Sequence, residues 1–313
     1  VGCRYEMEEA KLGSARLRRR AEELAKQTEL LSAGAAGGGG GGGRGGGGGG
    51  KRTAGERFGS TSRERDLEGV VEALKRGARV VGAAPYTDSN PHGQIDRVFE
   101  MAREFDVDID MHLDFGEDAA ELDVDYVCEL TERFKYGGRV TVGHVTKLST
   151  ATPDHFTATA KRMADAGVAV TVLPSTDLFL MGRVDERSVK RGVTPVHKLL
   201  QHGVNCSLST NNVLNPFTPF GDCSLIRMAN LYANICQVGA RAEVRDCFDM
   251  ITSRSAGILG LENYGINVGA PADLVVIDAP APETAVAELA PPLWGFKRGR
   301  MTFKRAPVEV LKP

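Results

Sequence analysis

Apolar and polar positions fall into repeating blocks from residue 64 to about residue 260, and these blocks predict alternating strands and helices. Short, continuously apolar runs are typical of strands buried on both faces, whereas apolar residues every three or four positions indicate amphipathic helices. The expected strands cover residues 78–85, 108–114, 139–145, 169–175 and 205–210. The expected helices cover residues 64–76, 92–105, 153–166, 195–202, 221–238 and 243–260, with one more around Val127, Leu130 and Phe134.

This pattern amounts to five β/α repeats, which predicts the α/β class with a parallel sheet. Two architectures fit, an open doubly wound sheet or a (β/α)₈ barrel. A complete barrel needs eight strands and roughly 250 residues, so a barrel here would be partial, with about five of its eight β/α units. Residues 265–304 predict a small appended β-sandwich element, with a strand at Leu274–Ile277 and a hairpin around Arg298 and Gly299.

Two segments of different composition precede the repeats. Residues 14–31 place apolar side chains on one stripe and predict a helix. The run from Gly37 to Gly50, broken only by Arg44, has nothing to bury and predicts a flexible linker. The expected organisation is an N-terminal helix, a glycine-rich linker, a barrel portion and a β-sandwich return, at residues 1–32, 33–63, 64–264 and 265–313.

Composition narrows the class of protein. The chain has 313 residues, 42% of them hydrophobic, which is enough for a sizeable core. A formal net charge of −2 argues against a nucleic-acid partner, and no apolar run approaches membrane-span length, so we expect no membrane partner. The six cysteines are scattered and form no CxxC pair, as in a reduced cytoplasmic protein with buried thiols.

Candidate chemistry gathers at the carboxyl ends of the expected strands, where barrel active sites lie. One strand ends at His112 and Asp114, the next ends at His144, and the pair Asn211 and Asn212 follows the fifth. Neutral imidazole binds Zn²⁺ or Fe²⁺ and also carries protons, but buried histidines are often structural. From these residues alone both readings stay open.

The order of these motifs resembles the cytosine deaminase branch of the amidohydrolase superfamily over about residues 64–305. Single motifs are weak, but several in the same order at sensible spacing are specific. The matching stretches are Arg79–Pro85, His112-x-Asp114, Gly143-His144, Pro174–Leu178, Gly182-Arg183, Arg191–Val193, Asn211-Asn212, Asn215–Phe217, and Gly269 with Ala272–Val276.

The resemblance implies a TIM-type barrel that hydrolyses a C–N bond in a cyclic amidine or amide, such as a pyrimidine or triazine, with hydroxide on a bound Zn or Fe ion as nucleophile. It makes His112 the metal ligand after strand 5 and His144 the catalytic histidine after strand 6. It places Asp114 among the catalytic residues, and Asn211, Asn212 and Asp177 at the substrate. Asp177 and Arg183 could face a ligand, but an interhelical salt bridge is the role that we favour for them.

Three departures qualify this resemblance. The family's His-x-His pair has no counterpart, since the first histidine is His92; Phe115 stands where a glutamate is expected, and Asn211 stands where a metal-binding aspartate is expected. An amide is a poorer metal ligand than a carboxylate and takes up no proton at neutral pH. We therefore expect a metal-dependent amidohydrolase with impaired activity. The alternatives are a non-catalytic binding or regulatory protein on the same fold, or a truncated fragment that does not fold stably. We expect such a fragment to aggregate, or to be compensated by a partner or by forming a homo-oligomer.

Overall fold

Five parallel strands form the central sheet of the computed structural model, which describes residues 60–309 and residue 311. The strands pair in chain order, β1-β2-β3-β4-β5. A doubly wound sheet reverses its strand order partway, so sequential pairing identifies a partial TIM barrel and excludes the doubly wound alternative. The expected N-terminal helix and most of the linker lie outside the described residues. The strands are β1 (Val80–Val81), β2 (Asp108–Leu113), β3 (Val140–His144), β4 (Val168–Val172) and β5 (Cys206–Leu208).

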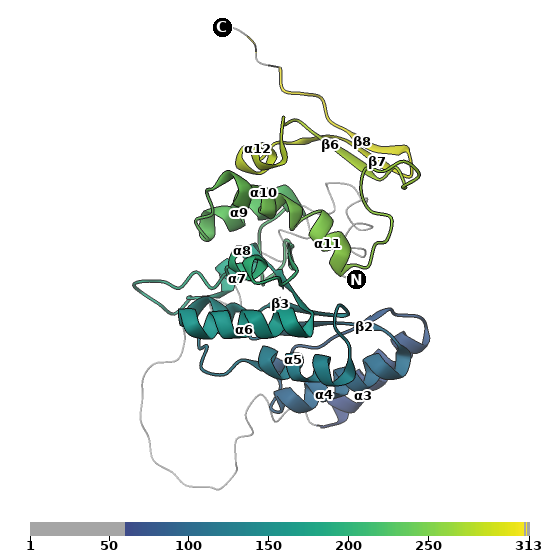
Figure 1. Cartoon of the computed structure of the whole chain (residues 1–313), viewed down its shortest axis with the longest axis vertical. Coiled ribbons are helices and arrows are strands. Elements are labelled where there is room, and N and C mark those ends of the chain that lie inside the picture. The colour runs from purple at the N-terminus through teal and green to yellow at the C-terminus, as the bar shows by residue number, and fades with distance from the viewer. Residues whose placement is uncertain (1–59, 310, 312–313) are drawn as a thin grey trace, which may run out of the picture.

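Helices follow each strand, as the sequence pattern predicts. Helices α3 to α6 lie together on one side of the sheet, and α9 to α11 lie between the sheet and the C-terminal strands (Figure 1). The helices are α3 (Ser60–Lys75), α4 (Pro91–Phe105), α5 (Asp123–Phe134), α6 (Pro153–Ala166), α7 (Pro174–Leu180), α8 (Val196–Gln201), α9 (Leu225–Ile235), α10 (Arg241–Asp249) and α11 (Ser253–Ile258), with 3₁₀ turns η2 (Pro85–Thr87) and η3 (Thr146–Thr150).

Helix α6 shows how the local sequence fixes an element. It begins after Thr152, whose hydroxyl accepts a hydrogen bond from the amide of His155, and Pro153 occupies the first helical position. It ends at Gly167, which adopts a φ of 71° that favours glycine. Phe156 and Met163 are buried on the face toward the sheet. The expected bounds of this helix are therefore confirmed.

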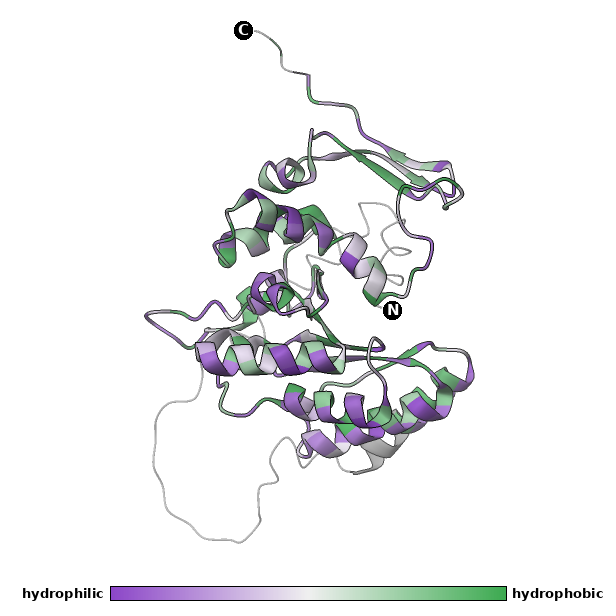
Figure 2. Cartoon of the chain, in the orientation of Figure 1, coloured by the Kyte–Doolittle hydropathy of each residue, from purple (hydrophilic) through white to green (hydrophobic). Residues whose placement is uncertain are grey.

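Strand β2 departs from the expected strand buried on both faces. Ile109 and Met111 are buried against the helices, whereas Asp108 and Asp110 on the opposite face are exposed and His112 is half-buried. Figure 2 shows the mixture of apolar and polar residues through the sheet and helices. One face of β2 is thus core, and the other is a polar surface.

Two expected elements end earlier than the apolar pattern suggests. The fourth strand stops at Val172, and Pro174 starts α7, because proline suits a first helical turn and cannot donate to a sheet. The predicted helix over residues 243–260 is two helices, α10 and α11. The carbonyl of Met250 at the break accepts a hydrogen bond from the amide of Leu208 in β5, so the break ties the helices to the sheet.

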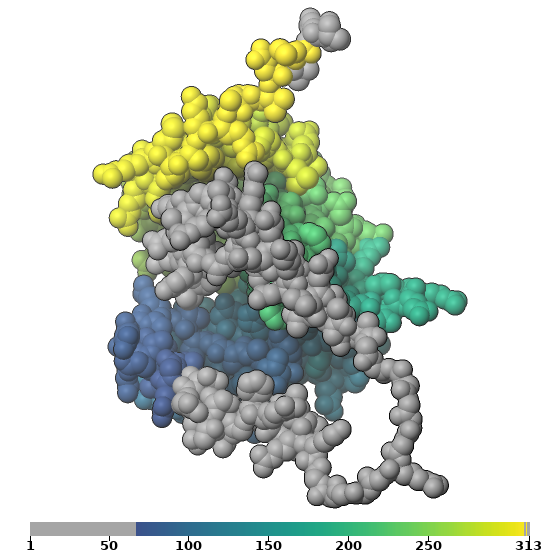
Figure 3. Space-filling view, turned by 180° about the vertical axis from the view of Figure 1, so that it is seen from behind, coloured from purple at the N-terminus to yellow at the C-terminus, as the bar shows by residue number. Residues whose placement is uncertain are grey.

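A separate antiparallel sheet follows the barrel portion and confirms the predicted C-terminal β element. It contains β6 (Leu274–Ile277), β7 (Pro292–Lys297) and β8 (Arg300–Lys304), with α12 (Pro282–Ala287) between β6 and β7. This sheet lies at the opposite end of the molecule from α3 and α4 (Figure 3). None of the helices within residues 60–309 combines the length and apolar character needed to cross a membrane.

Candidate functional site

The carboxyl ends of β2 and β3 bring two histidines into direct contact. The parallel register sets His112 opposite Gly143 and Leu113 opposite His144. His112 Nδ1 lies 2.8 Å from His144 Nε2, which is a hydrogen bond between the rings. The sequence placed both histidines at neighbouring strand ends, and the structure brings them together. Two linked imidazoles can pass a proton between them.

Asp177 continues this series of hydrogen bonds on the other side of His144. Its Oδ1 lies 2.5 Å from His144 Nδ1, and its Oδ2 accepts a hydrogen bond of 3.2 Å from the amide of Leu173. The carboxyl group is fully buried, and burial raises its pKa while the hydrogen bond from His144 opposes that rise. Both oxygens contact protein groups, which favours a positioning role over direct substrate contact.

The ionic contact of Asp177 joins α7 to the end of β3 and not to another helix, which differs from the expected interhelical salt bridge. Among the described residues the ionic partner of Asp177 is His144, whereas the Arg183 guanidinium lies 5.3 Å from the centre of the Phe179 ring. Asp177 lies in the buried first turn of α7, where a nearby imidazole satisfies it. The exposed Arg183 instead makes a cation–π contact with Phe179.

The two asparagines after β5 have different neighbours. Asn211 Nδ2 lies 3.4 Å from His144 Nε2, so this side chain joins the imidazole pair. Asn212 Oδ1 accepts a hydrogen bond of 2.7 Å from Asn215 Nδ2 and braces the loop that follows. Of the two predicted substrate contacts, Asn211 is therefore the one placed beside His144.

Asp114 lies apart from the imidazoles. Its two oxygens accept hydrogen bonds of 2.9 Å from the amides of Asp123 and Val124, and Lys147 Nζ lies 3.4 Å away. The side chain is fully buried, and burial raises its pKa while these hydrogen bonds oppose the rise. This geometry places Asp114 at the start of α5, where it satisfies amides that lack helical partners, rather than beside reacting atoms.

Aromatic rings line the imidazole pair. Phe115, at the position of the expected glutamate, lies edge-on to His144 with ring centres 5.1 Å apart. Tyr86 lies 5.5 Å from Phe115, and burial, followed by the charge of Asp177, raises the pKa of its hydroxyl. The Phe115 and Tyr86 rings can pack against a planar ligand, but they supply no carboxylate.

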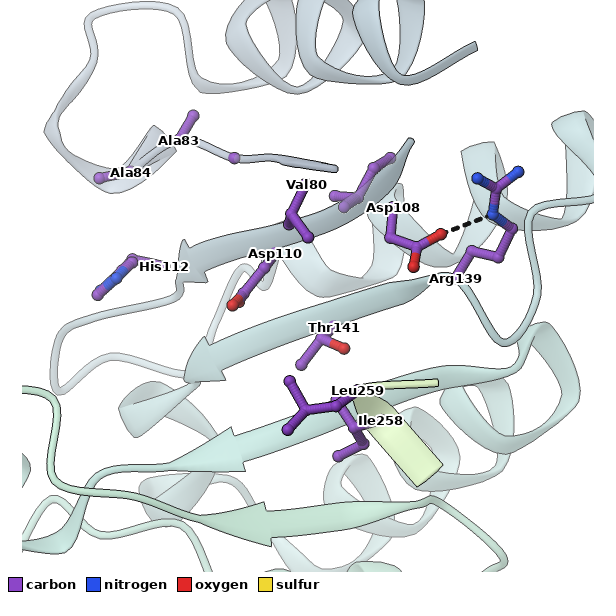
Figure 4. A pocket seen from close by; sticks show the side chains of 12 residues that line it. Val80, Ala83, Ala84, Asp108, Asp110, His112, Arg139, Thr141, Ile258 and Leu259 are labelled. Atoms are coloured by element: carbon purple, nitrogen blue, oxygen red, sulfur yellow. Dashed lines mark hydrogen bonds and ion pairs between the residues drawn. The ribbon is translucent and has the colours of Figure 1, made fainter. Parts of the chain in front are cut away.

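A cavity of about 490 Å³ extends along the polar face of β2, within the size range of small-molecule pockets. Figure 4 shows His112 and Asp110 projecting toward it from β2, and Arg139 bound to Asp108 at its far end. Desolvation lowers the pKa of His112 to about 4, with a further contribution from His144, so the ring is neutral near pH 7.

Asp110 is a cavity residue that the sequence reasoning missed. It lies two positions before His112, on the same face of β2. The alternation Asp108, Asp110, His112 was the available signal, since period-two spacing puts all three on one face. The apolar pattern predicts a strand buried on both faces and so gives no place to a polar face.

The described residues do not by themselves fit the expected Zn or Fe ion. No group of three His, Cys, Asp or Glu side chains in residues 60–309 is arranged to hold a metal. The hydrogen bond between the imidazoles already occupies His112 Nδ1 and His144 Nε2, which leaves His112 Nε2 as the open nitrogen. A catalytic zinc site normally has three protein ligands.

Comparison with known proteins gives a consistent assignment. The N-isopropylammelide isopropyl amidohydrolase of Pseudomonas sp. (strain ADP) is 30% identical over 246 residues, covering 76% of this chain and 58% of the relative. The pterin deaminase of Rhizobium rhizogenes is 30% identical over 212 residues, covering 67% of this chain and 48% of that protein. The chain thus spans about half the length of these relatives.

Solved structures share the fold. The 5-methylcytosine deaminase from Klebsiella pneumoniae, crystallised with 5-fluorocytosine, superposes with a TM-score of 0.76 at 24% identity. The match covers 80% of this chain and 62% of that one. A sequence profile described as Amidohydrolase family matches residues 45–301, which is most of the chain. The chain belongs to the amidohydrolase family.

Proposed function

We propose that this chain acts in hydrolytic deamination of a small nitrogen heterocycle of the pyrimidine or triazine class, and that its own residues turn the substrate over weakly. The observation that carries the proposal is the hydrogen-bonded series His112, His144 and Asp177 at the carboxyl edge of the sheet. Relatives named for an ammelide, a pterin and 5-methylcytosine support the substrate class.

The site has the parts for binding and orienting such a ring. Phe115 contacts His144, Tyr86 contacts Phe115, and Asn211 supplies an amide beside His144. Of the imidazole pair, His112 lines the cavity along β2. A planar heterocycle with ring nitrogens and an exocyclic amine matches this mixture of apolar and hydrogen-bonding groups. The imidazole pair supplies groups that accept and return a proton.

Weak turnover follows from the groups beside the imidazoles. Hydrolysis of a C–N bond needs an activated water and an acid for the departing amine. Amidohydrolases typically use a divalent metal for the first task, and the described residues offer too few ligands for one. For the second task Phe115 and Asn211 provide no carboxylate, and Asp114 and Asp177 are engaged elsewhere.

The second candidate function is heterocycle binding without turnover. The same two side chains favour it, because Phe115 packs against His144 and Asn211 contacts its Nε2 at 3.4 Å. Both arrangements give the imidazole stable neutral neighbours. Such a site would bind a heterocycle without hydrolysing it, as a sensor or regulatory protein does.

One set of measurements separates these functions. Purified chain is titrated calorimetrically with cytosine, an aminotriazine and a pterin, and ammonia release is followed with and without added zinc or iron. We expect binding of at least one ring, and slow ammonia release that His144→Gln abolishes. His155→Gln, on the outer helix α6, is the matched control and should retain both properties.

Each outcome has a definite meaning. Binding together with ammonia release that depends on His144 supports the deaminase proposal. Binding without any release, even with metal, supports the second candidate. If no ring binds in the millimolar range, both are overturned.

The cellular setting is also a proposal. The scattered cysteines, three of them buried at Cys128, Cys206 and Cys247, fit a reducing cytoplasm. A homo-oligomer is a further expectation, because β1 and β5 each pair on one side only within the described sheet. Light scattering on the purified chain would give its mass directly.

A further inference from the structure

We infer that a second cavity, between helix α8, residues 190–195 and the C-terminal end of α9, binds a phosphate monoester of a small molecule. Its volume is about 320 Å³, which lies within the range of small-molecule pockets. None of its described lining residues belongs to the imidazole series at the sheet edge. The cavity is therefore separate from the proposed function, and its ligand does not depend on that function.

Basic side chains gather around this cavity. Lys190, Arg191 and Lys198 line it together with the imidazole of His197, and no aspartate or glutamate is among its lining residues in the described part of the chain. The whole chain carries a formal net charge of −2, so this concentration of positive charge is local. A cavity lined by charges of one sign attracts a ligand of the opposite sign.

Two of these cations lack a carboxylate partner. Lys190 pairs with Glu117 at 3.1 Å, whereas within residues 60–309 no carboxylate lies at ion-pair distance from Arg191 or Lys198. Arg191 Nη1 donates instead to the main-chain carbonyl of Ile235 at the end of α9. This contact holds the guanidinium in place, and its other N–H groups make no hydrogen bond to the described residues. A guanidinium with free N–H groups can bind two phosphate oxygens at once.

The neighbouring titratable groups leave the positive charge in place. Burial raises the pKa of the Cys236 thiol to about 11, although the charges of Arg191 and Lys198 act to lower it, so the thiol is neutral near pH 7. Burial also lowers the pKa of His197, an effect that Lys198 reinforces and Glu243 opposes. The ring is therefore neutral as well, and it can donate one hydrogen bond. The charge that meets a ligand comes from the arginine and the lysines.

The backbone that carries these side chains is fixed by buried hydrogen bonds. The Thr194 hydroxyl lies 2.7 Å from the carbonyl oxygen of Val145 and 3.2 Å from that of His144. The amide of His197 donates to the hydroxyl of the buried Tyr232 over 3.0 Å. A binding site whose backbone is already ordered loses less conformational entropy when a ligand enters.

The rest of the lining favours an organic phosphate over phosphate alone. Ser149 supplies a hydroxyl group, and Val193, Pro195 and Ile235 supply apolar surface. Inorganic phosphate would leave that apolar surface in contact with water. A small organic group attached to the phosphate would cover it, and this burial adds to the affinity.

Calorimetry and NMR on the purified chain test this site. Inorganic phosphate, phenyl phosphate and benzyl alcohol are titrated at low ionic strength, with sodium chloride at matched ionic strength as the reference. We expect phosphate to bind in the millimolar range, phenyl phosphate to bind about tenfold more tightly, and benzyl alcohol not to bind. In ¹H–¹⁵N spectra the amide signals of Gly192, His197 and Lys198 should shift with both phosphates.

Variants at Lys198 test the role of the charge. Lys198→Gln should weaken the binding of phenyl phosphate by about tenfold, because it removes one charge-assisted contact, and Lys198→Glu should abolish binding. The side chain is exposed, so both variants should fold, and their circular dichroism spectra check this. Lys161→Gln changes an exposed lysine on α6 that does not line the cavity, and this matched control should bind like the wild type.

Four results would contradict the assignment. If neither phosphate nor phenyl phosphate binds in the millimolar range, the cavity is no anion site. Heats that sodium chloride reproduces at the same ionic strength would report charge screening and not binding. Binding that survives Lys198→Glu, or signal shifts confined to other parts of the chain, would place the anion elsewhere. Equal affinity for phosphate and phenyl phosphate would overturn the monoester as the ligand.

Discussion

Replacing Asp114 tests whether this carboxyl group is structural or catalytic. Asp114 is fully buried and accepts hydrogen bonds of 2.9 Å from the amides of Asp123 and Val124. These amides belong to the first turn of α5, where no helical carbonyl is available to them. Asp114→Ala removes both acceptors and offers no replacement, since the site is closed to bulk water.

The size of the stability loss follows from the two amide donors that Asp114→Ala leaves without an acceptor. A buried amide left without a partner costs about 1–3 kcal/mol, so the two amides together should lower the free energy of unfolding of Asp114→Ala by about 2–6 kcal/mol. Loss of the contact with Lys147, at 3.4 Å, adds less because that side chain is partly exposed. Asp114→Asn keeps one carbonyl acceptor and should cost about half as much.

Urea unfolding followed by far-UV circular dichroism measures this loss. Fluorescence of Trp294, the single tryptophan, follows the distant C-terminal sheet in the same samples. Asp165→Ala, which removes an exposed carboxyl group on α6, is the matched control and should unfold like the wild type. An Asp114→Ala chain within about 1 kcal/mol of the wild type would refute the structural assignment. If Asp114→Ala lost substrate turnover without losing stability, Asp114 would instead be a catalytic residue.

Three further outcomes are expected. Folding lowers the pKa of His112 to about 4, so the unfolded chain binds more protons and the free energy of unfolding should fall as pH drops from about 6.5 to 4. Because the side chain is partly exposed, we expect a loss of about 1–2 kcal/mol. In urea titrations at several pH values, His112→Gln should abolish this dependence. Tyr136→Phe removes a hydroxyl that donates to buried backbone carbonyls 2.8 and 3.1 Å away, and should lower the unfolding free energy by about 1–2 kcal/mol in the same assay. Gly192→Ala places a methyl group 2.3 Å from Met181 at a φ of 65°, and should lower the melting temperature by several degrees, whereas Gly239→Ala, which meets open space, should not.

The sequence was sufficient for features set by local pattern and strand order. The contact between His112 and His144 was predictable because neighbouring parallel strands end at one edge of the sheet. The bounds of α6 were predictable from Thr152, Pro153 and Gly167.

Features that depend on how deeply a side chain is buried, or on contacts between residues far apart in the sequence, were not predictable. Asp177 contacts His144 only because α7 begins directly after β4 and turns its first residues inward. Asp114 follows His112 closely in sequence, yet it turns toward α5 at a φ of 47°, which no spacing rule indicates. Asp110 was missed because its strand was interpreted as apolar on both faces.

The alternation of β2 also protects the chain from misfolding. Side chains in a strand have a period of two, so a slip of one residue against β3 would turn Asp108 and Asp110 into the helix layer and expel Ile109 and Met111. Buried carboxylates without partners make that slipped state costly. The acidic residues that shape the cavity therefore also select the correct strand pairing. Asp110→Val would enlarge the apolar surface and also lower the cost of mispaired, aggregation-prone sheets.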